Sequence, residues 1–205
     1  MMIRRVCGAF VTSVLAGILL FSGCAASSRK VLVMPREGSE DIELMVTKEL
    51  GVMIRMLKDA GFDAVVASNS GKPFVGRTLT VNSDLKYADV HVDDYAGFLM
   101  PCMAAGEQAP IPDEAVRIVT GAAAAEKPIA AQRGSLFILS RAGLLKGRKY
   151  AYVVAMFPEG IYSGSGVVQD GNIMTSAICP FTAFPGDGTA ELTRMLIKSL
   201  SASAR

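Results

Sequence analysis

The chain has 205 residues, of which 51% are hydrophobic and 20% are charged. This length and composition fit one globular domain with a sizeable core and leave little room for two. There are 21 lysines and arginines against 19 acidic residues, and there is no tryptophan. Because the chain is nearly neutral, with no basic cluster and few aromatic side chains to stack on bases, we do not expect it to bind nucleic acid.

The first 24 residues show the three regions of a bacterial export signal in order. Residues 4–5 are both arginine, residues 6–21 form a largely apolar stretch, and two small residues precede Cys24. The apolar stretch is shorter than the roughly 20 residues that span a bilayer comfortably. The run Phe-Ser-Gly-Cys resembles a lipobox, in which the cysteine sulfur receives diacylglycerol and a peptidase cuts the chain just before it.

We therefore expect a signal peptide over residues 1–23, lipidation of Cys24, a tether over residues 24–29 and one domain over residues 30–205. Two or three acyl chains would anchor the protein stably to a lipid bilayer. The expected location is the cell envelope, with the domain facing the periplasm. Ala25, in place of the aspartate that commonly retains lipoproteins at the inner membrane, favours the outer membrane in a cell with two. An ordinary secretory signal or an uncleaved anchor is the alternative.

Apolar strand-length runs alternate with amphipathic helix-length segments from residue 30 onward, as βαβ units around a parallel sheet require. The pattern predicts strands over 31–34, 64–67, 98–100, 129–131 and 150–154, and an antiparallel hairpin over 167–174 with its turn at 170–171. Weaker signals suggest strands over 78–81 and 90–92. We expect an α/β fold with a mostly parallel sheet of about five or six strands and helices on both faces.

Four helices are predicted between these strands. The first covers residues 40–60 behind Ser39 as N-cap, because apolar residues recur there at spacings of three and four. Pro112 opens the second, over residues 113–124. The third runs through residues 135–144, and the fourth lies near the C-terminus.

Histidine and cysteine are too sparse for a common zinc motif. His91 is the only histidine, and no CxxC or HExxH pattern occurs. We expect His91 to be a solvated loop residue and predict neither a metal site nor a cofactor. If Cys7 leaves with the signal and Cys24 is lipidated, then Cys102 and Cys179 are the only two thiols in a compartment that permits disulfides.

Five sequence segments in a fixed order resemble the ThiJ/PfpI (DJ-one) family. They are VLVMPREGSEDIE after the first strand, DDYAGFLMP before a mid-chain turn, KPIAAQRG, AGLLKGRK, and VVQDGNIMTS at the hairpin. The resemblance covers about residues 30–176. It implies a flavodoxin-like three-layer sandwich of the class I glutamine amidotransferase-like type. It also leaves room for a homodimer, since members of this family often dimerise.

The family places a reactive cysteine at a strained elbow between a central strand and a helix. A Pro-Gly-Gly turn and a protonated glutamate from the first helix assist it. The resemblance assigns Glu43 to the glutamate, Pro101 to the turn proline and Gly134 to the glycine after the elbow. It assigns the elbow cysteine to Gln132, whose amide is no nucleophile, and the residue after it, frequently histidine, to Arg133.

The two turn glycines of the family are replaced by Cys102 and Met103. With the elbow nucleophile, the adjoining histidine and the turn glycines all missing, the family's cysteine-dependent chemistry cannot simply be carried over. We expect the Gln132 amide to donate a hydrogen bond to Glu43. A Cys102–Cys179 disulfide would close the pocket entrance, but it needs Cα atoms within about 7 Å, and two separate thiols remain the favoured outcome.

Three functions follow from this sequence. The leading one is a membrane-anchored pseudoenzyme that binds a small-molecule or protein ligand in a vestigial pocket of Glu43, Gln132, Arg133 and Cys102. The second is a hydrolase or glyoxalase-like enzyme with a rearranged site, in which Cys102 acts as a thiolate near Glu43 and Arg133. The third is a purely structural component of the envelope.

Overall fold

The computed structural model describes residues 29–182 and 185–203. The signal peptide and the lipidated cysteine expected at Cys24 lie outside the described residues. The expected domain boundary at residue 30 coincides with the first residue of the first strand, β1 (Lys30–Val33).

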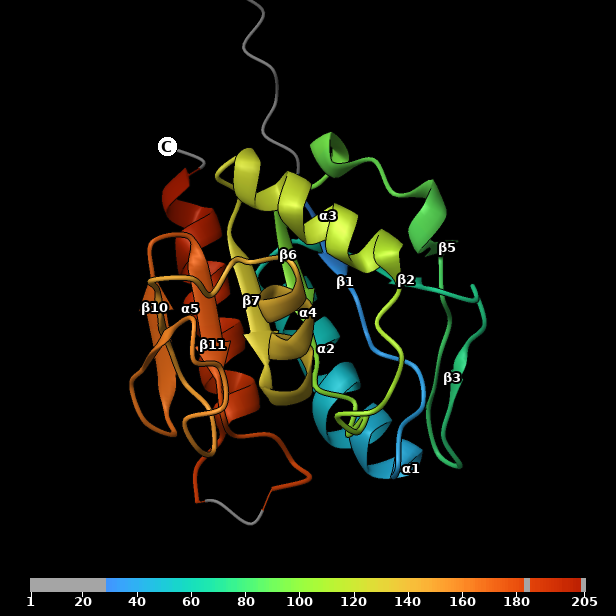
Figure 1. Cartoon of the computed structure of the whole chain (residues 1–205). Coiled ribbons are helices and arrows are strands. Elements are labelled where there is room, and N and C mark those ends of the chain that lie inside the picture. The colour runs from blue at the N-terminus through green and yellow to red at the C-terminus, as the bar shows by residue number, and fades with distance from the viewer. Residues whose placement is uncertain (1–28, 183–184, 204–205) are drawn as a thin grey trace, which may run out of the picture.

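A seven-stranded sheet forms the centre of the domain, in the order β10-β11-β7-β6-β1-β2-β5 (Figure 1). All neighbouring strands run parallel except β10 and β11, which form the antiparallel hairpin. The other strands of this sheet are β2 (Asp63–Ser68), β5 (Leu85–Lys86), β6 (Gly97–Met100), β7 (Ile129–Gln132), β10 (Val167–Asp170) and β11 (Ile173–Ser176). The expected mostly parallel α/β fold is confirmed.

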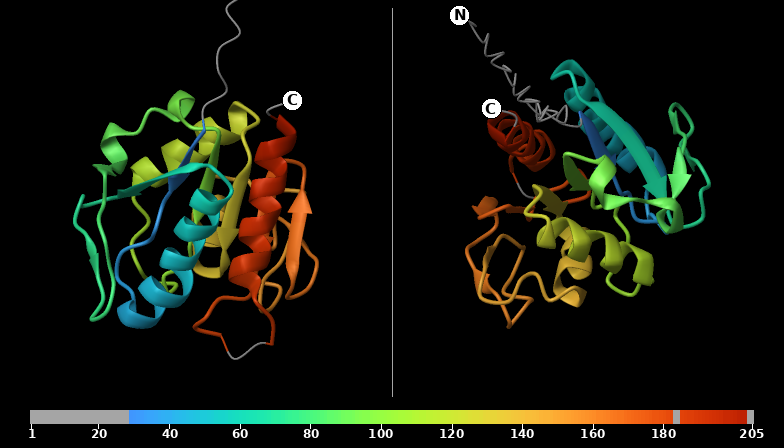
Figure 2. Two further views of the ribbon diagram at one scale, coloured as in Figure 1. Left: turned by 180° about the vertical axis from the view of Figure 1, so that it is seen from behind. Right: turned by 90° about the horizontal axis from the view of Figure 1, so that it is seen from above.

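Helices cover both faces of the sheet because its buried strands are apolar on both sides. In β1, Leu32 belongs to one core, while Val31 and Val33 belong to the other. The first core lies under α3 (Asp113–Ala124) and α4 (Leu136–Arg141), which face the viewer in Figure 1. The second lies under α2 (Gly51–Asp59) and α5 (Gly188–Ser203), seen in front when the molecule is viewed from behind (Figure 2).

The first helical segment is less regular than its pattern predicts. It comprises α1 (Ile42–Met45), a π-helical turn η1 (Val46–Leu50) and then α2. Its N-cap is Asp41, whose Oδ1 accepts a hydrogen bond of 3.0 Å from the Leu44 N–H. The prediction of Ser39 as N-cap is wrong, because Ser39 is instead held in an antiparallel bridge with Ala105.

Two predicted strands differ from the structure. Over 150–154 only β8 (Lys149–Tyr150) forms, and it pairs with β9 (Ile161–Tyr162) outside the main sheet. The N–H groups of Lys149 and Ala151 donate to the side chains of Asp170 and Thr175 in the hairpin, so they are not available for a ladder with its backbone. Over 90–92 the chain makes local turns, η2 (Tyr87–Asp89) and η3 (Val92–Asp94), rather than a ladder. The remaining short strands are β3 (Phe74–Val75) and β4 (Thr80–Val81). His91 is exposed between the two turns, as expected.

Candidate functional site

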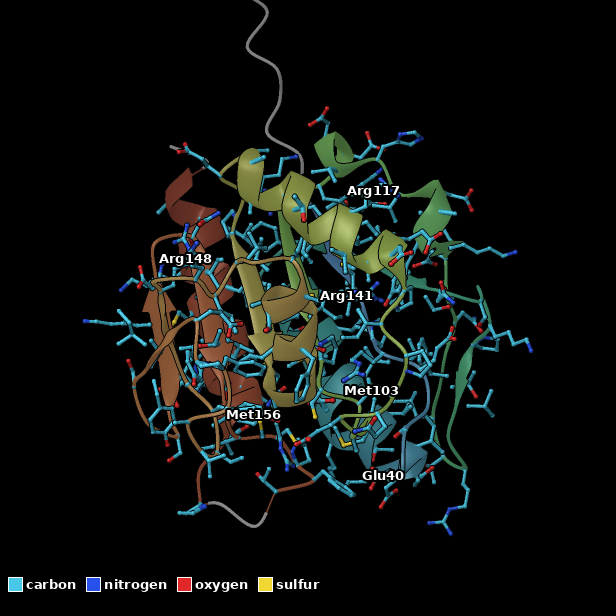
Figure 3. The ribbon with its side chains drawn as sticks, viewed as in Figure 1. Glu40, Met103, Arg117, Arg141, Arg148 and Met156 are labelled. Carbon is cyan, nitrogen blue, oxygen red and sulfur yellow. The ribbon has the colours of Figure 1, made fainter. Side chains whose placement is uncertain are left out.

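Three loops meet where parallel strands of the sheet end. Strand β6 leads into Cys102, β7 leads into Arg133, and β11 leads into Cys179. The carboxyl ends of parallel strands share one edge of the sheet, and ligand sites in open α/β folds form at that edge. Figure 3 shows the labelled Glu40 and Met103 at this end, toward which the arrowhead of β7 points in Figure 1.

The elbow after β7 is centred on Arg133. Gln132 is still extended, with φ −107° and ψ 126°, whereas Arg133 has φ +36° and begins the 3₁₀ turn η4 (Arg133–Ser135). A positive φ is costly for a residue other than glycine, so surrounding contacts must hold this turn. Ser135 Oγ donates to the Pro101 carbonyl at 2.6 Å, and Arg36 Nη1 donates to the Gly134 carbonyl at 2.7 Å. The assignment of Gln132 to the elbow is therefore wrong by one residue.

Gln132 and Glu43 do not form the expected hydrogen bond. The buried Gln132 Nε2 donates to the Ile178 carbonyl and, at 3.1 Å, to Thr189 Oγ1, so it ties β7 to the loop that carries Cys179. Glu43 binds another loop: its carboxylate accepts from the Thr78 hydroxyl and from the backbone N–H of Arg77 and Thr78. The Thr78 hydroxyl is the main reason why the pKa of Glu43 is lowered. Glu43 is therefore not a residue of this site.

The glutamate that reaches the site is Glu40, three residues before Glu43. It lines a cavity of about 80 Å³ together with Cys102, Arg133, Tyr152 and other residues. Its backbone N–H donates to the Ala104 carbonyl at 3.2 Å, in the loop after β6. The sequence offers two glutamates within one turn of each other, and only the position of the helix start decides which of them faces the cavity.

Cys102 and Cys179 lie beside each other as free thiols. Each of their sulfur atoms lies within 4.8 Å of the other and of a carboxylate oxygen of Glu49. Cys102 donates its S–H to Cys179, which also accepts hydrogen bonds from the Arg133 side chain and the Phe181 N–H. The structure thus places the two free thiols side by side, and the expectation that they stay unbonded remains a prediction.

These contacts separate the acidities of the two thiols. The Cys102 hydrogen bond, assisted by Phe181 and Arg133, lowers the pKa of Cys179 to about 6 in spite of its burial. The same hydrogen bond, together with burial and the nearby Glu49 charge, raises the pKa of Cys102 well above its ordinary value. These contacts favour the thiolate at Cys179 over the thiolate at Cys102.

Glu49 is a site residue that the sequence reasoning missed. It is fully buried in η1, and its carboxylate accepts hydrogen bonds from the Cys102 N–H at 3.1 Å and the Met103 N–H at 2.8 Å. Burial raises the pKa of Glu49 well above its ordinary value, and the Cys179 charge adds to this effect. The available signal was its position in the helical pattern: Glu49 follows Val46 by three residues and precedes Met53 by four, so it falls on the apolar face.

Glu49, Cys102 and Cys179 are also the one group of three potential metal ligands among the residues that the structure describes. Two sulfur ligands and a carboxylate suit a borderline or soft cation such as Zn²⁺. The sequence-based expectation of no metal site rested on the scarcity of histidine, and it did not foresee this group.

Comparisons with known proteins agree with this geometry. The model of the DJ-1/PfpI family matches residues 29–183. A protein named deglycase from Thermococcus kodakarensis is 31% identical over 153 residues, covering 72% of this chain and 89% of the relative. Another, from Pyrococcus abyssi, is 29% identical over 164 residues, covering 77% and 92%. The crystal structure of a ThiJ/PfpI domain protein from Brachyspira murdochii superposes with a TM-score of 0.67 at 15% identity, covering 86% of this chain and 98% of that one.

None of the helices in the described part of the chain is long and apolar enough to cross a membrane.

Proposed function

The chain belongs to the DJ-1/PfpI family, and from that premise we propose that it is a lipid-anchored envelope enzyme whose nucleophile has moved from the elbow to Cys179. Its proposed substrates are small carbonyl compounds, the class suggested by the relatives that are named deglycases. This proposal refines the second of the functions expected from the sequence, with Cys179 in place of Cys102 as the attacking thiolate.

One observation carries the proposal: Arg133, the residue at the elbow, is near enough to the Cys179 sulfur to lower the pKa of that thiol. The side chain that stands at the strained position is therefore the group that stabilises a thiolate elsewhere in the same site. Arg133 and Phe181, two of the hydrogen-bond donors to Cys179, also line the cavity with Glu40 and Tyr152. A thiolate is the activated form of a cysteine nucleophile, and Arg133 and Phe181 stabilise it next to the cavity.

The reaction that this arrangement supports is addition to a carbonyl group. The Cys179 thiolate forms a C–S bond to the carbonyl carbon, and the electron pair of the C=O bond moves to oxygen. Arg133 stabilises the resulting oxyanion, and the Cys102 S–H supplies the proton that converts it to a hemithioacetal. The negative charge then rests on Cys102 until water returns a proton.

The test is consumption of methylglyoxal by the purified protein at pH 7. We expect turnover by the wild type, loss of turnover in Cys179→Ser, and normal turnover in Arg141→Gln, which removes a distant surface guanidinium. Equal rates for wild type and Cys179→Ser, or no consumption by either, would overturn the proposal.

A non-catalytic binding role is the second candidate, and the burial of the thiols favours it. Cys102 is 2% exposed and Cys179 is 3% exposed, so a substrate must open the cavity wall to reach either sulfur. In that role Arg133 and Glu40 would hold a small polar ligand in the cavity. The methylglyoxal assay separates the two candidates, because a binding protein leaves the compound unchanged.

Anchoring of the domain at the membrane is proposed on the N-terminal sequence alone. The order of charged, apolar and small residues before Cys24 supports it. The domain itself would then work in the periplasm, where a thiol pair meets oxidants.

A further inference from the structure

We propose that Glu49, Cys102 and Cys179 form a metal site that binds one Zn²⁺ ion per chain and leaves the fourth position of the ion open to the cavity. The site goes beyond the proposed carbonyl chemistry and does not depend on it, because the placement and kind of the three ligands carry it. Both uses need the Cys179 sulfur, so a bound ion and a carbonyl substrate exclude each other.

The ligand atoms of the three side chains converge on one point. The two sulfurs and a carboxylate oxygen of Glu49 all lie within 4.8 Å of one another, although they come from η1 and from the loops after β6 and β11. With Zn–S bonds of about 2.3 Å, two sulfur ligands of a tetrahedral ion lie about 3.8 Å apart. Side-chain shifts on the order of 1 Å therefore bring the three atoms to bonding distance.

A cation at this point would compensate a carboxyl group that has no cationic partner. Glu49 is fully buried, and among the described residues the one ion pair joins Arg141 to Asp113. The Glu49 carboxylate meets only backbone N–H groups as hydrogen-bond donors. Buried charges in proteins are commonly paired or coordinate a metal ion.

The kind of ligand selects Zn²⁺ over hard cations. Sulfur ligands suit Zn²⁺, whereas Mg²⁺ and Ca²⁺ take oxygen ligands. When bound to the ion, two thiolates and one carboxylate carry three negative charges, of which Zn²⁺ offsets two. The third is offset by Arg133, whose guanidinium lies near enough to Cys179 to interact with its charge. The thiol protons leave to the buffer on binding, and no group is oxidised or reduced.

Backbone and hydroxyl contacts already hold the ligands in place. The Glu49 carboxylate accepts from the Cys102 N–H at 3.1 Å and from the Met103 N–H at 2.8 Å, and each of its oxygens keeps a second lone pair for a metal. The Thr182 hydroxyl donates to the Cys179 carbonyl at 2.7 Å and fixes the turn that carries this cysteine. Outer contacts of this kind orient the ligands of metal sites.

Three protein ligands leave one tetrahedral position for an exchangeable ligand. Structural zinc sites have four protein ligands, whereas sites that exchange a ligand have three. Cys102 and Arg133 both line the cavity of about 80 Å³, which is large enough for a water molecule. We therefore expect water or a small anion from the cavity as the fourth ligand, and the Arg133 charge favours the anion.

The test uses Co²⁺ as a probe, because it occupies zinc sites and its absorbance reports the ligands. The full chain carries Cys7→Ser and Cys24→Ser, so that Cys102 and Cys179 are its only thiols. It is treated with a chelator and a phosphine reductant before Co²⁺ is added. We expect one Co²⁺ per chain, with the visible bands of a tetrahedral ion and the near-ultraviolet charge-transfer absorbance of two thiolates. Zn²⁺ should displace the Co²⁺, and Mg²⁺ should not.

Single substitutions assign the ligands. Cys102→Ser and Cys179→Ser should each halve the charge-transfer absorbance per bound Co²⁺, whereas Glu49→Gln should keep it. Loss of an outer contact alone costs a metal site about 10–100-fold in affinity, so each of the three substitutions should weaken Zn²⁺ binding by on the order of 100-fold or more.

Two control variants should bind Zn²⁺ as tightly as the wild type. Glu43→Gln changes a carboxylate on the same helical segment that binds another loop. His91→Ala removes the only histidine, which is exposed. Circular dichroism of the metal-free variants checks their folding, and the thiolate absorbance of the wild type decides the question even where a variant does not fold.

The outcomes separate the metal site from the proposed function. An octahedral Co²⁺ spectrum without thiolate absorbance, or Zn²⁺ binding that is unchanged in Cys179→Ser, would overturn the site. Turnover of methylglyoxal that continues undiminished in the Zn²⁺-loaded protein would do the same. Tight Zn²⁺ binding by a protein that leaves methylglyoxal unchanged in its metal-free form would support the site and overturn the proposed function.

Discussion

Replacing Arg133 with glutamine removes the cation beside Cys179 and keeps a side chain of similar length. The guanidinium acts on the thiolate through a hydrogen bond and through its charge. Opposite charges at such range shift a pKa by about 1–3 units. Because Arg133 contributes less to the lowered pKa of Cys179 than the Cys102 hydrogen bond does, we expect a rise in the lower part of that range, from about 6 to roughly 7–8. A glutamine at position 133 must adopt the same positive φ as the arginine, so the substitution leaves the backbone strain at the elbow unchanged.

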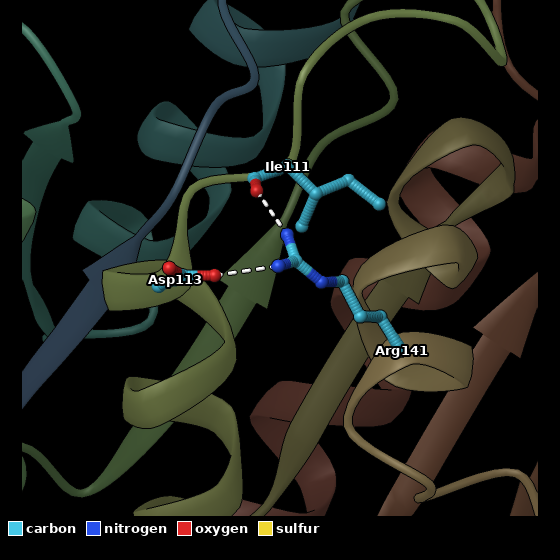
Figure 4. A network of polar contacts seen from close by, with 3 residues as sticks. All are labelled: Ile111, Asp113 and Arg141. Atoms are coloured by element: carbon cyan, nitrogen blue, oxygen red, sulfur yellow. Dashed lines mark hydrogen bonds and ion pairs between the residues drawn. The ribbon is translucent and has the colours of Figure 1, made fainter.

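The assay is a titration of the reduced protein, with the thiolate followed by its ultraviolet absorbance and each cysteine identified by alkylation and peptide mapping. At pH 6.5 the thiolate fraction of Cys179 should fall from roughly three quarters to between about a quarter and a few per cent. Arg141→Gln is the control. Its guanidinium donates to Asp113 and to the Ile111 carbonyl, in a contact that involves neither thiol (Figure 4). An Arg133→Gln midpoint equal to that of the wild type would refute the electrostatic reasoning.

Three further changes test other parts of the account. At pH 5, where the Cys179 thiol is protonated, Arg133→Gly should raise the free energy of unfolding by about 1 kcal/mol by removing strain at a positive φ, as measured by urea denaturation; a loss of stability would contradict it. Gly188→Ala should lower that free energy by about 1–3 kcal/mol, because a Cβ there would lie 2.4 Å from the Ile178 carbonyl oxygen; an unchanged thermal midpoint would show that the loop yields easily. Cys24→Ser should release the protein from the membrane fraction or leave its precursor uncut, and normal processing with membrane retention would exclude lipidation.

The sheet was largely predictable because a strand that is buried on both faces is a short, nearly continuous apolar run in the sequence. The runs that became β1, β2, β6 and β7 are apolar and short, and the turn at residues 170–171 marked the hairpin. The run at 150–154 is equally apolar but belongs to a separate two-stranded sheet. Its partners are β9 and two side chains of the hairpin, and the local sequence does not contain such non-local pairing.

The candidate site was predictable only to within a few residues. Cys102, Arg133 and Gly134 were correctly expected near one another, because each follows the end of a buried strand. The elbow lies at Arg133 instead of Gln132 because the end of β7 depends on contacts from Arg36 and Ser135.

The positions of two glutamates explain most of the remaining difference between the predicted site and the site in the structure. Glu40, not Glu43, lines the cavity because the helix is capped at Asp41, which leaves Glu40 in the preceding loop. Glu49 is buried beside Cys102 because its carboxylate replaces water as the partner of two backbone N–H groups. The contact between Cys102 and Cys179 joins loops 77 residues apart, and no local pattern reports such a contact.

The proposed nucleophile, Cys179, must carry the negative charge of the thiol pair. Brief alkylation of the fully reduced wild-type protein with iodoacetamide at pH 7, followed by peptide mass spectrometry, measures this for each cysteine. We predict that Cys179 is modified first and that Cys102 stays unmodified until the protein is unfolded. Modification of Cys102 before Cys179, or of neither thiol before unfolding, would contradict it.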